Sequence, residues 1–223
     1  MITYDKVLAR LTALKDDRYA AFHSKLLKND SVKLIGVRTP NLRALAKEWK
    51  GEADTFLAFP DEYYEVTFLK CALVGMLKYE EFVKRVDTVV PLLDNWATCD
   101  TFTAPCVKKH KEEFLPFIKR YLQSDKEFTV RYGLVMLLHY YVETQYLPLI
   151  FESVRNLKKN DYYIMTGAAW LIAEVLVEYF QEGVHFLEEG YMPKATHNKA
   201  IQKACESYRI SDEEKTFLKS LKR

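Results

Sequence analysis

The sequence predicts an all-α protein built from stacked pairs of antiparallel helices. Apolar residues recur at spacings of three and four almost everywhere along the 223 residues, which is the period of one helix face. The chain holds only seven Gly and seven Pro, too few for the many turns of an all-β sandwich or barrel. Similar helical segments also recur along the chain at intervals typical of helical repeat proteins, roughly 30–40 residues.

The N-terminal segment carries the chemistry of helix starts and ends. Thr39 is expected to cap a helix whose first residue is Pro40, where the missing N–H costs nothing. Gly36, just before, is expected to close a preceding helix or to form a turn with positive φ. Trp49 is expected to close this N-terminal helix before Gly51.

Four similar helical segments follow this N-terminal part. They start near Tyr64, Cys99, Phe128 and Tyr163, so successive starts are 35, 29 and 35 residues apart. Units of this length stack into solenoids, and the absence of a TPR signature favours the HEAT-like type, whose curved stack has a concave binding face. The alternative is a plain helical bundle with accidental spacing. Each segment is followed by a second amphipathic segment: residues 79–93, 111–122, 144–157 and 181–189.

A chain of this length fits one large domain or two small ones. We expect a single HEAT-like repeat domain over residues 1–223. Residues 1–60 would form an N-terminal cap, residues 61–194 the central repeats, and residues 195–223 the C-terminal cap helices.

Composition excludes several classes of function. The chain has no GxGxxG or GxxxxGK[ST] loop for phosphate, and none of its four cysteines lies in a CxxC pair. The histidines show no ligand spacing, so we expect neither a metal nor an organic cofactor. The N-terminus is charged and has no long apolar region, which predicts a cytoplasmic protein without a membrane segment. Nothing in the sequence suggests an oligomer, so a monomer is expected.

The segment 94–100, DNWATCD, is the most informative for chemistry. Trp96 and Asp100 are four residues apart, so in a helix both side chains lie on one face. Thr98 is expected to cap that helix, which would place Asp100 near its positive end. A carboxylate beside an indole ring is suited to stabilising a sugar cation. The alternative is an ordinary first-turn acid next to a core tryptophan.

Several motifs then occur in a fixed order from about residue 30 to the end. Together they resemble the AlkD-like DNA alkylation repair family, the HEAT-like repeat DNA glycosylases. Each motif alone is weak, and the order makes the resemblance specific. The motifs are IGVRTPNLR (35–43), NWATCD (95–100), FTVR (128–131), GAAWL (167–171) and NKAIQK (198–203).

The resemblance implies a concave face that holds duplex DNA with alkylated bases. It implies excision of positively charged alkylpurines such as 3-methyladenine and 7-methylguanine. Asp100 would stabilise an oxocarbenium-like sugar and position the attacking water, while Trp96 and Trp170 would line the deoxyribose. Arg131 would hold a nearby phosphate. The alternative for Arg131 is an internal ion pair, for which Asp100 is a candidate partner.

Positive charge is concentrated in the C-terminal half of the chain. Residues 1–100 carry 15 basic and 15 acidic side chains, residues 103–131 seven and four, and residues 190–223 eight and four. Because phosphate contacts dominate DNA affinity, the basic segments are candidate DNA contacts. The alternative for each lysine is a solvated helix face. The residues expected to contact DNA are Arg38, Lys108, Lys109, Arg131, Lys199 and Lys203.

Three functions remain open at this stage. The first is a DNA glycosylase for cationic alkylated purines. The second is a non-catalytic DNA-binding protein of the same family, and the departure that favours it is the absence of a basic residue at 162–166 (YYIMT), before Trp170. The third is a protein–protein scaffold, a common use of helical solenoids.

Overall fold

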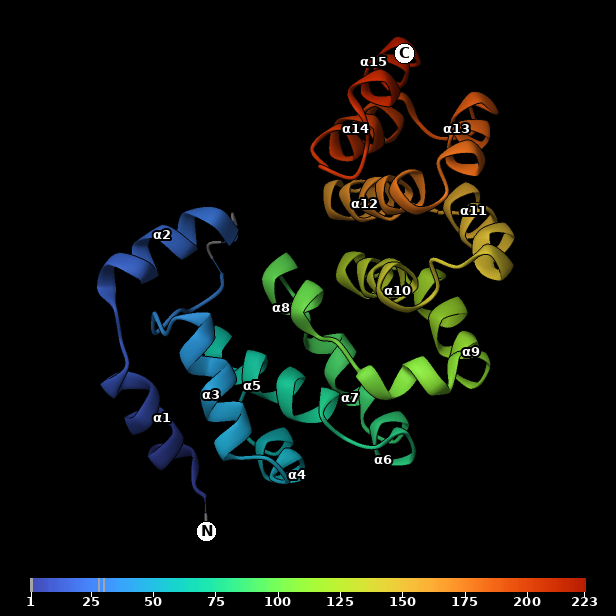
Figure 1. The fold of residues 1–223 in the computed structure, drawn as a ribbon. Coiled ribbons are helices and arrows are strands. Elements are labelled where there is room, and N and C mark those ends of the chain that lie inside the picture. Colours follow the sequence, from blue (N-terminus) through green and yellow to red (C-terminus); the bar gives the residue numbers. More distant parts are fainter. Residues whose placement is uncertain (1, 28, 30) are drawn as a thin grey trace. The chain divides into compact units, whose positions relative to one another are not determined.

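The computed structural model describes residues 2–27, 29 and 31–223, and within these ranges it contains helices and connecting turns but no strand (Figure 1). The predicted all-α repeat architecture is confirmed. Contacts divide the chain into two compact units, residues 1–110 and 111–223. The subdivision into caps and central repeats within a single domain stays a prediction.

The first unit is built around one buried helix, α5. Every residue of α5 except Ala72 is buried, and α3, α4, α7 and α8 pack on it. The elements of this unit are α1 (Tyr4–Ala13), α2 (Asp17–Leu27), α3 (Thr39–Glu48), α4 (Ala53–Leu57), α5 (Tyr64–Gly75), α6 (Tyr79–Val83), α7 (Val86–Val89), η1 (Val90–Leu92), α8 (Trp96–Thr101) and η2 (Pro105–Lys109).

Two charged side chains are buried inside α5, and both hold loops in place. The carboxylate of Glu65 accepts hydrogen bonds from the backbone N–H groups of residues 35, 36 and 37, at 3.0, 2.7 and 3.1 Å. The ammonium group of Lys70 donates to the carbonyl oxygen of Phe59 at 2.6 Å and to Asp61 Oδ1 at 2.7 Å. Burial of these charges is tolerable because each has several partners.

Two glycines permit the close chain approaches in this unit. Gly36 has φ of 100°, as the sequence predicts for a turn, and it lies in a loop rather than at the end of a helix. A Cβ added to Gly75 would stand 2.2 Å from the carbonyl oxygen of Thr103, so only glycine lets the segment after α8 lie against the end of α5. Trp49 ends α3 as expected, whereas the cap before Pro40 is Arg38 and not Thr39.

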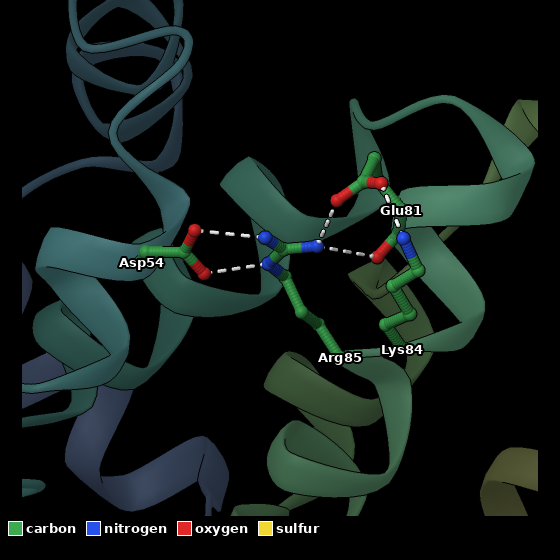
Figure 2. Close-up of polar contacts among 4 residues, drawn as sticks. All are labelled: Asp54, Glu81, Lys84 and Arg85. Atoms are coloured by element: carbon green, nitrogen blue, oxygen red, sulfur yellow. Dashed lines mark hydrogen bonds and ion pairs between the residues drawn. The ribbon is translucent and has the colours of Figure 1, made fainter.

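An ion-pair cluster joins α4 to the α6–α7 turn (Figure 2). Arg85 forms two parallel bonds to Asp54, at 2.6 and 2.8 Å, and a third to Glu81 at 2.5 Å. Lys84 binds the other oxygen of Glu81 at 2.8 Å. Hydrogen bonds from Arg85 lower the pKa of the Asp54 carboxyl, and those from Lys84 and Arg85 lower the pKa of Glu81. Both acids therefore remain ionised partners of this bidentate arginine.

The second unit consists of two layers of helices (Figure 1). Helices α10, α12 and α14 stack in order in one layer, while α9 and α13 pack against the other side of α10 and α12. The expected pair at 163–189 is formed by α12 and α13, which pack together. Helices also occur at 128–140 and 147–155, but α10 packs on α9 and α12 and not mainly on α11. The elements are α9 (Lys111–Leu122), α10 (Glu127–Tyr140), η3 (Thr144–Tyr146), α11 (Leu147–Arg155), α12 (Tyr162–Glu178), α13 (Phe180–Glu188), α14 (Lys194–Cys205) and α15 (Asp212–Ser220).

Candidate functional site

Helix α8 begins with a well-formed cap. The side chain of Asn95 accepts a hydrogen bond from the backbone N–H of Thr98 at 3.0 Å, and Asn95 Nδ2 donates to Asp94 Oδ1 at 2.7 Å. Asn95 is 1% exposed, so this cap is held inside the unit. An asparagine cap of this kind fixes the start of a helix and thereby the direction of the residues that follow.

The structure corrects two expectations about α8. Thr98 was expected as its cap, but that role belongs to Asn95, and the Thr98 hydroxyl donates back to the Asn95 carbonyl oxygen at 3.2 Å. The helix begins at Trp96, three residues before the expected start at Cys99, and ends at Thr101. Asp100 therefore lies in the last turn and not in the first, so the helix dipole does not favour its charge there.

The indole ring of Trp96 is fixed by the end of another helix. Its Nε1 donates to the carbonyl oxygen of Leu26 at 3.2 Å, and Leu26 lies in the last turn of α2. A second bond holds the start of α8 itself: Asn29 Nδ2 donates to the carbonyl oxygen of Asp94 at 3.0 Å. Carbonyls at the end of a helix lack partners within that helix, so they are natural acceptors for this N–H.

Trp96 and Asp100 share the partly exposed face of α8. Both side chains are half-buried, whereas Ala97, Thr98 and Cys99 between them are buried against the unit. Residues four apart on a helix are neighbours, so an indole edge and a carboxylate lie one turn apart at the surface of the first unit. Both residues therefore lie in one helix, four positions apart, while their catalytic role stays a prediction.

Arg131 lies in the second unit and is 6% exposed. Its Nη1 donates to the carbonyl oxygen of Tyr163 at 2.8 Å and to Thr166 Oγ1 at 3.0 Å, so it links α10 to the first turns of α12. A second link is the Glu127 carboxylate, which accepts from the backbone N–H of Tyr163 at 2.7 Å. These bonds give Arg131 a structural role, and its contact with a phosphate stays a prediction.

Trp170 lies on the same face of α12 as the residues that bind Arg131. Tyr163, Thr166 and Trp170 follow one another at spacings of three and four, which places them in one row along the helix. The indole of Trp170 is half-buried, and its ring meets His139 of α10 edge to face, with centroids 6.2 Å apart. Arg131 and Trp170 therefore belong to the same pair of adjoining helices.

The other predicted DNA contacts are surface residues. Arg38 binds Asp16 Oδ2 at 2.7 Å and lies over the ring of Tyr19, so it already has partners. Lys108 and Lys109 are exposed in η2. In α14, the ammonium of Lys199 donates to Gln202 at 3.2 Å, and Lys203 pairs with Glu206 at 3.1 Å. Exposed pairs of this kind are weak, so these cations remain able to contact phosphates.

Sequence reasoning missed the polar residues that support these elements. Glu65, Lys70 and Glu127 each bind backbone atoms of a loop or a neighbouring helix. The available signal was a charged residue within an otherwise apolar helical run, as in YEVTFLKCALVG at 64–75.

Within the parts of the chain that the structure describes, no three His, Cys, Asp or Glu side chains are grouped so as to hold a metal ion. None of the described helices is long and apolar enough to cross a bilayer.

A buried histidine in α2, the helix whose Leu26 carbonyl binds the Trp96 indole, makes the stability of the fold depend on pH. His23 of α2 lies between the rings of Tyr19 and Tyr64, with centroids 5.3 and 5.0 Å away. Burial lowers the pKa of His23 below its ordinary value of 6.5, against an opposing effect of Glu65. The unfolded chain therefore binds this proton more readily, and stability is lost as the pH falls through 6.5.

We expect the melting temperature of the wild-type protein to fall more between about pH 7.5 and about pH 5.5 than that of His23→Phe. Circular dichroism at the two pH values measures both changes. Because the other histidines are common to the two proteins, the difference isolates His23. Equal falls in the two proteins would contradict this prediction.

Fold and site together define an all-α helical repeat protein that carries a tryptophan–aspartate pair on a short capped helix. The chain belongs to the DNA alkylation repair enzyme family, whose sequence profile matches residues 7–204. No curated protein matches the chain at a significant level of similarity. The resemblance found from the motifs is thereby confirmed at the level of the family.

Proposed function

We propose that this protein is a DNA glycosylase that excises positively charged alkylated purines from duplex DNA. The observation that carries the proposal is the pairing of Trp96 and Asp100 on the partly exposed face of α8. Membership of a DNA alkylation repair family supplies the substrate class. The Asn95 cap and the bond from Trp96 to Leu26 support it further, because a catalytic pair must be held in one orientation.

Cleavage of the N-glycosidic bond of a cationic purine depends more on stabilising positive charge on the sugar than on acid catalysis. A purine alkylated at N3 or N7 carries a positive charge, so cleavage of its N-glycosidic bond releases a neutral base and leaves the positive charge on the sugar. Asp100 stabilises that oxocarbenium-like sugar and orients the water that adds to C1′, and the water's proton is lost to solvent. Trp96 and Trp170 line the deoxyribose. No step requires a metal or an organic cofactor.

Binding to the duplex comes from cations on both units. Arg38, Lys108 and Lys109 supply them in the first unit, and Lys199 and Lys203 in the second, with Arg131 placed among α10 and α12. Phosphate contacts release counterions, so affinity for duplex DNA falls steeply as salt is raised. A monomer in the cytoplasm completes the proposal.

The test is release of methylpurines from methylated duplex DNA by the purified protein. Chromatography of the released bases should show 7-methylguanine and 3-methyladenine, at rates well above spontaneous loss from the same DNA. Salt-dependent binding without release of either base would contradict the glycosylase and leave a DNA-binding protein. Absence of salt-dependent binding would contradict both.

A non-catalytic DNA-binding protein of the same family is the second candidate. The observation that favours it is Arg131, whose guanidinium is buried and bonded to Tyr163 and Thr166. A cation used in this way holds α10 and α12 together and is less available to a phosphate beside the reacting sugar. The base-release assay separates the two candidates, since only the first produces free methylpurine.

A further inference from the structure

A concave site lies in the second unit, on a different part of α12 from the residues that bind Arg131. It is a cavity of about 180 Å³ between the end of α11, the loop 157–160, the start of α12 and the turn before α14. That volume suits a phosphate with its attached sugar better than a whole drug-sized molecule.

One polar group in the wall of this cavity has no partner. Thr196 lines the cavity and is 3% exposed, and its hydroxyl oxygen, which is itself buried, forms no hydrogen bond with any residue that the structure describes. An unsatisfied buried hydroxyl is costly, and proteins seldom retain one without a use for it. Thr196 also lies in the first turn of α14, whose cap, Pro193, provides no side-chain acceptor for the N–H groups there. The donors at this position therefore suit an oxyanion.

The rim of the cavity is cationic. Three basic residues line it, Arg155, Lys158 and Lys159, and no acidic residue does so. Lys158 is exposed and makes no ion pair or hydrogen bond with any described residue. Arg155 pairs with Glu189. Lys159 donates to the carbonyl oxygen of Asp125 at 2.8 Å and lies 3.8 Å from the carboxylate of the same residue. All these bonds are at the surface, where they are readily exchanged for a ligand. The rim thus favours a ligand with negative charge.

An aromatic ring stands beside this cationic rim. Tyr191 lines the cavity and is 67% exposed, and the guanidinium of Arg155 lies 5.0 Å from the centre of its ring. Met165 and Met192 add apolar surface to the same walls. A flat ring can stack on the tyrosine at the mouth while a phosphate occupies the interior.

We propose that this cavity binds a nucleotide through its phosphate. The first turn of α14 holds the phosphate oxygens together with the Thr196 hydroxyl, whose side chain turns from the wall into the cavity on binding. Lys158 neutralises the charge, and Tyr191 stacks on the base. The same chemistry is presented by a free mononucleotide and by the phosphorylated 5′ end of a DNA strand. The site is independent of base excision by Asp100.

The test is calorimetric titration with AMP at low salt. Thr196→Val and Lys158→Ala should each weaken AMP binding by about tenfold or more, since a hydrogen bond to a charged group is typically worth that factor. Thr196→Ser, which keeps the hydroxyl, and Lys219→Ala, which removes an exposed lysine of α15, should change the affinity less than about twofold. No AMP binding at millimolar concentration, or equal affinity in all variants, would overturn the proposal.

A stability measurement guards against trivial loss of structure. Without ligand, the melting temperature of Thr196→Val should be unchanged or higher by about 2–4 °C, because the variant no longer buries an unsatisfied hydroxyl. A lower melting temperature would show that the hydroxyl serves the fold and would overturn its assignment to a ligand.

Three further probes identify what the site accepts. Inorganic phosphate should bind more weakly than AMP, and equal affinity would overturn the part assigned to Tyr191. A single-stranded hexanucleotide with a 5′ phosphate that binds as tightly as AMP identifies the end of a strand as the source. Loss of that binding, with AMP binding retained, identifies a free nucleotide. Because excision is not measured, these results stand whether or not the glycosylase proposal holds.

Discussion

Asp100→Asn is expected to lower the rate of methylpurine release by about 10²–10³-fold while leaving duplex affinity within about twofold of the wild-type protein. The asparagine keeps the shape of the side chain and removes its charge. Asp100 is not the cap of α8, so the helix should keep its start at Asn95. The melting temperature, measured beside the rate of excision, separates a loss of chemistry from a loss of fold. Single-turnover release of 7-methylguanine, with protein in excess, measures the chemical step.

The matched control lies six residues away. Asp94→Asn also neutralises a carboxylate beside α8, and its amide oxygen can still accept the bond from Asn95 Nδ2. This variant should retain excision within a few-fold, because Asp94 precedes the cap and is not on the face shared by Trp96 and Asp100. If both variants lost the same amount of excision activity, the effect would come from the overall negative electrostatic potential near α8 and not from Asp100 itself. Full activity in Asp100→Asn would remove Asp100 from the site.

The longer helices could be predicted from the sequence because their signals are repeated. Helices α10 and α12 span 14 and 17 residues, enough for several turns of apolar periodicity. Helix α8 spans only six residues, too few for a repeated period, so the sequence indicates its start only through a capping residue. Asn95 and Thr98 are both good caps, and the choice between them depends on Asn95 being buried beside Asp94.

The candidate site was predictable in its residues but not in its supports. The Trp-x-x-x-Asp spacing alone places Trp96 and Asp100 on one face. The bond from Trp96 to Leu26 spans 70 positions, and the bond from Arg131 to Tyr163 spans 32. Both acceptors are backbone carbonyls, which every residue possesses, so no side-chain pattern indicates which one is used.

The largest effect on stability is expected at Glu65. Glu65→Leu should lower the free energy of unfolding by about 3–5 kcal/mol, because it leaves three buried backbone N–H groups, at residues 35–37, without their acceptor. That is a large part of the 5–15 kcal/mol typical of a folded domain. Urea denaturation followed by circular dichroism measures the change. The loop concerned leads directly into Arg38 and α3, so its release should also loosen the N-terminal motif of the family.

Two further variants serve as controls. One removes the charge of Glu65 but keeps part of its hydrogen bonding, and the other removes an exposed charge from the same position of another helix. Glu65→Gln keeps one oxygen as the acceptor for the N–H groups of Gly36 and Val37, but its NH2 group replaces the oxygen that accepts from Ile35. The loss in free energy of unfolding should therefore be about half that of Glu65→Leu. Glu80→Gln changes an exposed acid in the first turn of α6, the same place in its helix as Glu65 in α5, and should cost less than about 0.5 kcal/mol. A Glu65→Leu protein as stable as Glu80→Gln would mean that residues 35–37 find other acceptors. Glu65 would then be a buried charge without a structural task, which its cost in an apolar helix argues against.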